Sequence, residues 1–269
     1  MLNIIFNVYR TVAGQIQHNH AFVGDIINEM VFPCKEIQSF SPRVGRGKIA
    51  QRLKIAIEYL HHETIESRLK AVYELEQIAQ DYPQHHWLIM EALSNFVRLN
   101  AFNISPAQLN TGSTSPLHAE IQAALTVIAQ RDRKQDPENK QLDLSHVDIR
   151  GANLRKANLE QANLYRVNLS GANLAEANLC GTILSAADLS GANLAGANLS
   201  GSILSAANLT GVNLTGANLS RASLYLANLQ EAILNETIFN EANLRDVKFT
   251  TTEISNGNSV SIRHPKSKS

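Results

Sequence analysis

The chain has 269 residues, 44% of them hydrophobic, and its 24 basic and 24 acidic residues balance. This balance gives no global attraction to nucleic acid or to an anionic membrane surface. No apolar stretch reaches the ~18–20 residues of a membrane span, and the two cysteines, Cys34 and Cys180, lie too far apart in sequence to suggest a disulfide framework, so we expect a cytoplasmic protein.

The first half of the chain is predicted to form helices. Thr64, and Asp81 before Pro83, are helix-start signals. A polar loop covers residues 105–116, and helical spacing of apolar residues runs through five windows: 2–16, 47–60, 64–80, 83–99 and 117–131. We therefore predict a helical domain over residues 1–133, followed by a charged linker over 134–141.

No motif in this half predicts catalysis or metal binding. Basic residues gather over 35–54, which we interpret as a solvated connection, with an anionic partner as the alternative. Histidines form two adjacent pairs, 61–62 and 85–86, but neighbours on a helix point about 100° apart and rarely bind one ion. Phosphate-binding glycine loops, nucleophile elbows and paired carboxylates do not occur in the sequence. We predict no catalytic residue, no metal, no cofactor and no small-molecule substrate.

From residue 142 to residue 249 the sequence repeats every five residues without an insertion. The 22 quintets have Leu at 19 centres, which fall at 144, 149 and so on to 249, and Ala at 14 of the positions two before the centre. The residue just before the centre is most often Asn, and Gly follows two after the centre in eight quintets. A five-residue period would spread Leu around every face of a helix, so it predicts a solenoid of short extended segments and bends instead. Leu and Ala should point inward, and Gly should occupy turns with positive φ.

These A(N/D)LXX quintets resemble the pentapeptide-repeat family. The resemblance implies a right-handed, four-sided parallel β-helix of about 5.5 coils over residues 142–249, with four quintets in each coil of 20 residues. Residues 52–98 are similar to a helical region found beside such repeats in cyanobacterial proteins, and their periodicity also fits HEAT-like hairpins. The fold class is therefore a helical domain followed by an all-β solenoid, with a polar tail over residues 250–269 that we expect to be disordered.

Some pentapeptide-repeat proteins protect DNA gyrase by imitating DNA, which requires a continuous acidic surface. Residues 142–249 carry seven basic and nine acidic side chains, the basic ones mainly on early coils and the acidic ones mainly on late coils. This segregation disfavours DNA mimicry.

One face of the solenoid is expected to carry an apolar facet. Positions 20 apart should stack, which places Ile183 on Ile203 where Asn is usual. With these two residues we assign to the apolar facet Tyr165, Tyr225 and Leu226. Ile233 and Ile238 form a smaller cluster on neighbouring faces. The apolar facet could reflect the strand preference of β-branched residues, or it could be a contact surface.

The sequence favours a non-catalytic scaffold that binds a protein partner, with a homodimer left open. The alternative is a membrane-associated or nucleic-acid-directed regulator that uses the basic residues over 35–54. The sequence implies neither membrane nor nucleic-acid binding directly.

Overall fold

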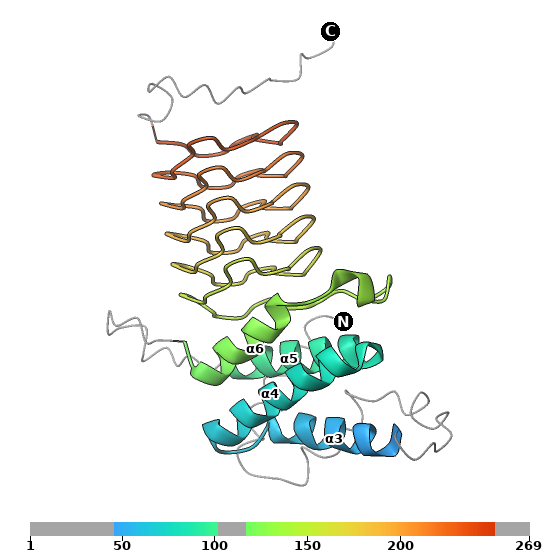
Figure 1. Cartoon of the computed structure of the whole chain (residues 1–269). Helices are drawn as coiled ribbons and strands as arrows, with labels where there is room; N and C mark the ends of the chain where they lie inside the picture. The colour runs from blue at the N-terminus through green and yellow to red at the C-terminus, as the bar shows by residue number, and fades with distance from the viewer. Residues whose placement is uncertain (1–45, 102–116, 251–269) are drawn as a thin grey trace, which may run out of the picture. The chain divides into compact units, whose positions relative to one another are not determined.

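A computed structural model describes residues 46–101 and 117–250 (Figure 1). The chain divides into two compact units between Arg52 and Leu53, and the description below concerns the unit that begins at Leu53. Several predictions lie outside the described residues: the helix over 2–16, Cys34, most of the basic segment, the loop over 105–116, and all but the first residue of the polar tail.

Within residues 46–101 and 117–141, four α-helices precede the repeats. They are α3 (Arg46–Tyr59), α4 (Ile65–Asp81), α5 (His86–Ala101) and α6 (Ala119–Ala129), with short 3₁₀ turns η1 (Pro83–His85) and η3 (Arg133–Gln135). Thr64 caps α4, since its hydroxyl accepts a hydrogen bond from the Ser67 amide at 3.3 Å. Asp81, predicted to start a helix, is instead the last residue of α4, because η1 separates it from α5.

Helices α4, α5 and α6 pack against one another around a shared apolar core. Leu75 of α4, Leu93 and Phe96 of α5, and Leu125 of α6 are completely buried. An ion pair also joins α4 to α6, since the Arg68 guanidinium lies 2.7 Å from the Glu120 carboxylate and both side chains are mostly buried. Burial raises the pKa of Glu120, but the hydrogen bond and charge of Arg68 outweigh it, so the pKa lies below its usual value.

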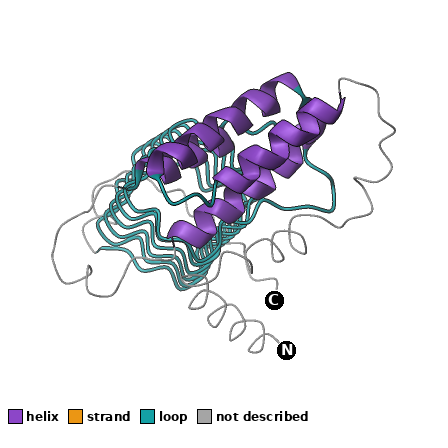
Figure 2. Ribbon diagram, turned by 90° about the horizontal axis from the view of Figure 1, so that it is seen from below, coloured by secondary structure: helices purple, strands orange, loops and turns teal. Residues whose placement is uncertain are grey.

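The repeats wind into parallel coils of 20 residues. The residue before each centre forms an isolated parallel bridge to the residue 20 positions further on, from Asp143↔Asn163 to Asn228↔Lys248. In these rungs the Leu144 amide donates to the Asn163 carbonyl, and the Asn163 amide donates to the Leu142 carbonyl. Each side of a coil has one bridging residue, because a corner follows within two residues. Figure 2 accordingly shows the coils as loops.

The inward and outward positions separate as the sequence predicts. Mid-solenoid centres such as Leu194 have no exposed surface, and the small residues two before the centres, such as Ala192, are 1% exposed. Every described corner, two residues after a centre, has positive φ, including eight glycines and thirteen other residues. Corner geometry is therefore imposed by the register of the repeat, and glycine is only one of the residue types that adopt it.

The helices close the N-terminal end of the coils. The inward centres of the first coil, Leu144, Ile149, Leu154 and Leu159, are at most 1% exposed although no coil precedes them. Helix α6 supplies missing backbone partners, since the Asn158 amide donates to the Ala129 carbonyl at 2.8 Å. Helix α5 adds an ion pair between Arg98 and Asp143 at 2.8 Å. Helices α4–α6 and the coils thus form one compact unit.

Candidate interaction surface

The five residues of the apolar facet lie in one stack of quintets, whose centres are Leu164, Leu184, Leu204 and Leu224. Parallel bridges run up this stack from Asn163 to Ile183, then to Ile203, then to Ser223. Ile203 is 42% exposed and Leu226 is 49% exposed, while Ile183, Tyr165 and Tyr225 are half-buried. The geometry thus brings the predicted residues together on the outside of four successive coils.

Other faces use asparagine at the positions where the apolar facet has isoleucine. The Asn193 Oδ1 atom accepts from the Ala195 backbone amide at 3.1 Å, and the side-chain Nδ2 atom of Asn213 donates to Asn193 Oδ1 at 3.3 Å. Such side chains form ladders that satisfy corner amides and join neighbouring coils.

Ile183 and Ile203 can make neither bond of the asparagine ladder. Consequently the amides of Ser185 and Ser205 have no hydrogen-bond partner within residues 46–101 and 117–250. The two quintets give up polar bonds and place apolar surface in water, and both changes cost free energy unless something covers them.

Two buried hydroxyls hold the same quintets from inside. Thr182 and Ser202 stand at the inward small-residue position, and each donates to the carbonyl three residues earlier at 2.7 Å, Leu179 and Leu199 respectively. Both residues are at most 1% exposed. The interior of these quintets therefore has no unsatisfied hydroxyl, and their unusual feature is confined to the outer surface.

Arginine and histidine side chains contact the two tyrosines of the apolar facet, and these contacts were not predicted from the sequence. The Arg166 guanidinium lies over the Tyr165 ring at 5.3 Å, and the Arg245 guanidinium lies over the Tyr225 ring at 5.0 Å. The His146 ring meets Tyr165 edge-on at 5.2 Å. Burial, followed by the charges of Arg166 and Arg98, lowers the pKa of His146, which favours its neutral form. The 20-residue spacing from His146 to Arg166 could have indicated this stack.

The smaller cluster lies near the last coil. Ile233 is 48% exposed and Ile238 is 43% exposed, and they bridge Asn213 and Asn218 on two different faces. The two isoleucines therefore do not stack on each other.

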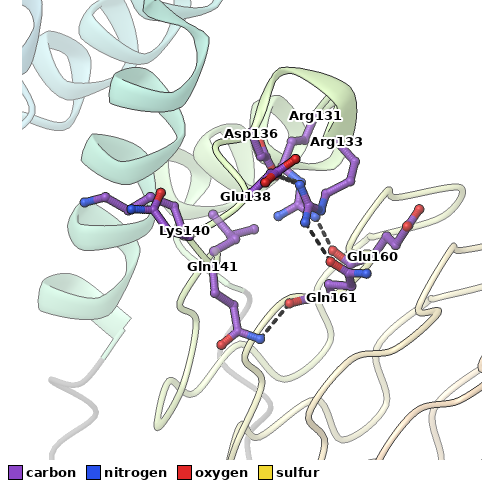
Figure 3. A pocket seen from close by; sticks show the side chains of 10 residues that line it. Arg131, Arg133, Asp136, Glu138, Lys140, Gln141, Glu160 and Gln161 are labelled. Carbon is purple, nitrogen blue, oxygen red and sulfur yellow. Dashed lines mark hydrogen bonds and ion pairs between the residues drawn. The ribbon is translucent and has the colours of Figure 1, made fainter.

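A polar cavity of about 270 Å³ lies between the linker and the first coil (Figure 3). Arg131 donates to the Glu160 carbonyl there, Arg133 donates to Gln161 Oε1 at 2.6 Å, and Gln141 donates to the Gln161 carbonyl at 2.7 Å. These charged and polar groups thus join the linker to the first coil.

Behind this cavity lies a buried ionic cluster. Arg131 and Asp136 are almost fully buried 3.4 Å apart, and the His86 Nε2 atom lies 3.8 Å from Asp136. Burial raises the pKa of Asp136, opposed by Arg131, Arg133 and His86, and burial lowers the pKa of His86. The cluster ties α5 to the linker.

Metal-ligating clusters and membrane-spanning helices are both absent from residues 46–101 and 117–250. No group of three or more His, Cys, Asp or Glu side chains there could hold a metal ion. No helix in the same ranges is long and apolar enough to cross a membrane.

Comparison with known proteins identifies the repeats. The family model of pentapeptide repeats matches in eight copies over residues 143–181, 182–221 and 222–256. Rfr23, a pentapeptide repeat protein from the cyanobacterium Cyanothece 51142, is 40% identical over 37% of this chain and 65% of Rfr23, with a TM-score of 0.26. Alr5209, a pentapeptide repeat protein from Nostoc PCC 7120, is 32% identical over 38% of this chain and 86% of alr5209, with a TM-score of 0.21.

A third structure is that of QnrB1, a plasmid-mediated fluoroquinolone resistance protein. It is 20% identical over 43% of this chain and 61% of QnrB1, with a TM-score of 0.29. This chain thus spans less than two thirds of the length of Rfr23 and of QnrB1. No curated protein matches it.

The quintets and the 20-residue coils agree with the family-model match. Helices α3–α6 precede the repeats, and several similar structures come from cyanobacteria. The chain belongs to the pentapeptide-repeat family.

Proposed function

We propose that this chain is a non-catalytic interaction protein whose solenoid presents the apolar facet to a protein partner. Pentapeptide-repeat proteins are in general structural or binding proteins, and some act through protein interactions. The proposal includes the right-handed winding that is typical of the family and a cytoplasmic location. It also includes the domain boundaries predicted from sequence: a helical domain over 1–133, a linker over 134–141 and a solenoid over 142–249.

The observation that carries the proposal is the break in the asparagine ladder at Ile183 and Ile203. A strand preference for isoleucine would explain the residue type, but it would not compensate the lost corner bonds or the exposed surface. A partner that covers the two side chains would compensate both, by burying apolar area and by accepting from the Ser185 and Ser205 amides.

The surroundings of the two isoleucines support a protein as the partner. Tyrosine and arginine are enriched where protein interfaces are most strongly bound, and Tyr165, Arg166, Tyr225 and Arg245 flank the isoleucines. The apolar facet is smaller than a complete interface of about 800 Å² per partner, so it would form the centre of a larger contact.

The proposal can be tested by photocrosslinking in the cells that make the protein. Benzoylphenylalanine replaces Ile203 in one variant and Asn193, at the same quintet position on another face, in a matched control. We expect a discrete adduct with one protein from position 203 and none from position 193. An adduct with a second copy of this chain would instead make the apolar facet a homodimer contact. Equal labelling from both positions, or none, would contradict the proposal.

A further inference from the structure

The two ends of the solenoid differ in how they are covered. Helix α6 and the linker close the first coil, whose centres are fully buried. In the last coil the corresponding centres Leu234, Phe239, Leu244 and Phe249 are partly exposed. Phe239 and Phe249 therefore do not fully bury this end of the solenoid, which is the red end of the coils in Figure 1.

The last coil also carries an unpaired rung of backbone. One coil earlier, the amides of Leu214 and Leu219 donate to the carbonyls of Ile233 and Ile238 at 2.8 and 2.7 Å. The equivalent amides of Leu234, Phe239 and Leu244 have no partner in the described part of the chain, which ends at residue 250. Free amides and carbonyls beside apolar side chains form an edge to which another extended segment can be added.

Four acidic residues surround this edge. They occupy the four successive corners of the last coil and are all exposed: Glu231, Glu236, Glu241 and Asp246. Glu241 pairs with Arg221 at 2.8 Å, and Asp246 pairs with Arg245 at 3.3 Å. The last coil itself contributes only two cations, Arg245 and Lys248, so the rim is negative.

The charge and the cap together restrict what can bind at this edge. The same end of a second copy would bring eight acidic corners together, which electrostatic repulsion opposes. The other end of a second copy is covered by α6, whose Ala129 carbonyl already accepts from the first coil. Stacking of copies in either sense is therefore disfavoured.

We propose that the last coil is a docking edge for a cationic, extended segment of another protein, which adds to the solenoid as its next rung. The segment lies along one side of the coil, because a corner follows each bridging position. An apolar side chain of the segment covers Phe239 or Leu244, its backbone pairs with the free amide on that side, and its Lys or Arg side chains face the acidic corners at either end of that side. This edge is distinct from the apolar facet, and the inference does not depend on that facet.

The test uses the full chain and a labelled probe peptide of about nine residues that alternates lysine and valine. Fluorescence polarisation gives its affinity, and hydrogen exchange locates it. Changing Glu231, Glu236 and Glu241 to Gln and Asp246 to Asn should weaken binding by about tenfold or more. In the wild type, the peptide should slow exchange of amides on one side of the last coil, within residues 232–249, and leave those of the first coils unchanged.

Two matched controls separate strand addition from general attraction of charges. A second variant removes four acidic groups elsewhere on the solenoid by Asp148→Asn, Glu160→Gln, Glu176→Gln and Asp188→Asn, and it should change affinity by less than about threefold. A peptide N-methylated at each lysine keeps its charge but loses the amides that would pair with the last coil, since the outward residue before each centre makes both bonds to the preceding coil, and it should bind about tenfold more weakly. Thermal melting checks that both four-site variants remain folded.

Several results would overturn the inference. Equal losses in the two four-site variants, or equal binding of the N-methylated peptide, would show attraction without strand addition. Absence of binding at about 1 mM peptide would show that the edge does not accept such a segment. Binding that appears only after Arg263, Lys266 and Lys268 are changed to Ser would identify the chain's own cationic segment as the occupant in place of another protein.

Discussion

The side chain of Gln122 exchanges two hydrogen bonds with the backbone of Asn153. The Gln122 Nε2 atom donates to the Asn153 carbonyl, and the Asn153 amide donates to Gln122 Oε1, both at 2.9 Å. Within the solenoid the same two bonds are made by the preceding coil, as when Asn173 accepts from the Leu154 amide and donates to the Ala152 carbonyl. A carboxamide on α6 therefore substitutes for a missing rung and joins the helices to the repeats.

Replacing Gln122 should weaken this junction. We expect Gln122→Ala to lower the free energy of unfolding by about 1–2 kcal/mol, and Gln122→Glu by at least as much, because a carboxylate cannot donate to the Asn153 carbonyl. Urea denaturation measures both. Gln130→Ala, at the end of α6 where no side-chain hydrogen bond forms, is the control and should stay within about 0.5 kcal/mol of the wild type. Equal effects at 122 and 130 would show that the carboxamide rung contributes nothing.

The corners allow a reciprocal test of backbone strain. Gly191 has a φ of 64°, and an added Cβ atom would meet nothing within 4 Å, so Gly191→Ala should cost about 1 kcal/mol through backbone conformation alone. Ala186 has a φ of 55° at the equivalent corner, so Ala186→Gly should be neutral or stabilising. Thermal melting measures both variants. A higher melting temperature for Gly191→Ala than for Ala186→Gly would contradict backbone strain at these corners.

The centres should tolerate no charge. Leu194 has no exposed surface, so Leu194→Asp buries a carboxylate without a partner and should cost several kcal/mol. Ala195→Asp, one residue later on the outer surface, is the matched control and should cost far less. Similar unfolding midpoints for the two variants would refute the inward placement of the centres.

Stability should fall as the pH is lowered from 7 to 5.5. Burial lowers the pKa values of His85, His86 and His146 from 6.5, partly opposed at His86 by Asp136 and Asp132. Below pH 6.5 the unfolded chain binds protons that the folded chain does not, so the free energy of unfolding decreases. Asp136, whose pKa burial raises from 3.8, acts with the opposite sign, because the folded chain retains a proton there that the unfolded chain releases. Denaturation curves at the two pH values and constant ionic strength measure the difference; equal or greater stability at pH 5.5 would contradict the burial of these rings.

The five-residue period was enough to predict which residues of the solenoid point inward and which point outward. Leu194 and Ala192 could be placed inside because a strict period leaves only one register in which apolar residues meet. The left-handed corners were recognised only at glycines such as Gly191, because Lys156 or Glu236 at the same position does not signal positive φ by its residue type. Register alone, applied to every corner, would have found them.

Contacts between elements far apart in the sequence were harder to predict. Gln122 is an ordinary polar residue within a helical pattern, and nothing in its neighbours indicates that it pairs with Asn153. The stacking of Ile183 on Ile203 followed from spacing, but the guanidinium groups over Tyr165 and Tyr225 depend on side-chain conformation. The exposed amides of the last coil became evident only from the hydrogen bonds that the preceding coil makes.

The most direct test of the central claim is the double change Ile183→Asn and Ile203→Asn. Asparagine is the usual residue at both positions and would extend the ladder, so the free energy of unfolding should be unchanged or higher. Binding of the protein that crosslinks to position 203 should fall by about tenfold or more, because the centre of the contact is removed. Asn193→Ser with Asn213→Ser on another face is the control and should leave binding intact. If the Ile183→Asn, Ile203→Asn variant binds as tightly as the wild type, the apolar facet is not the contact surface.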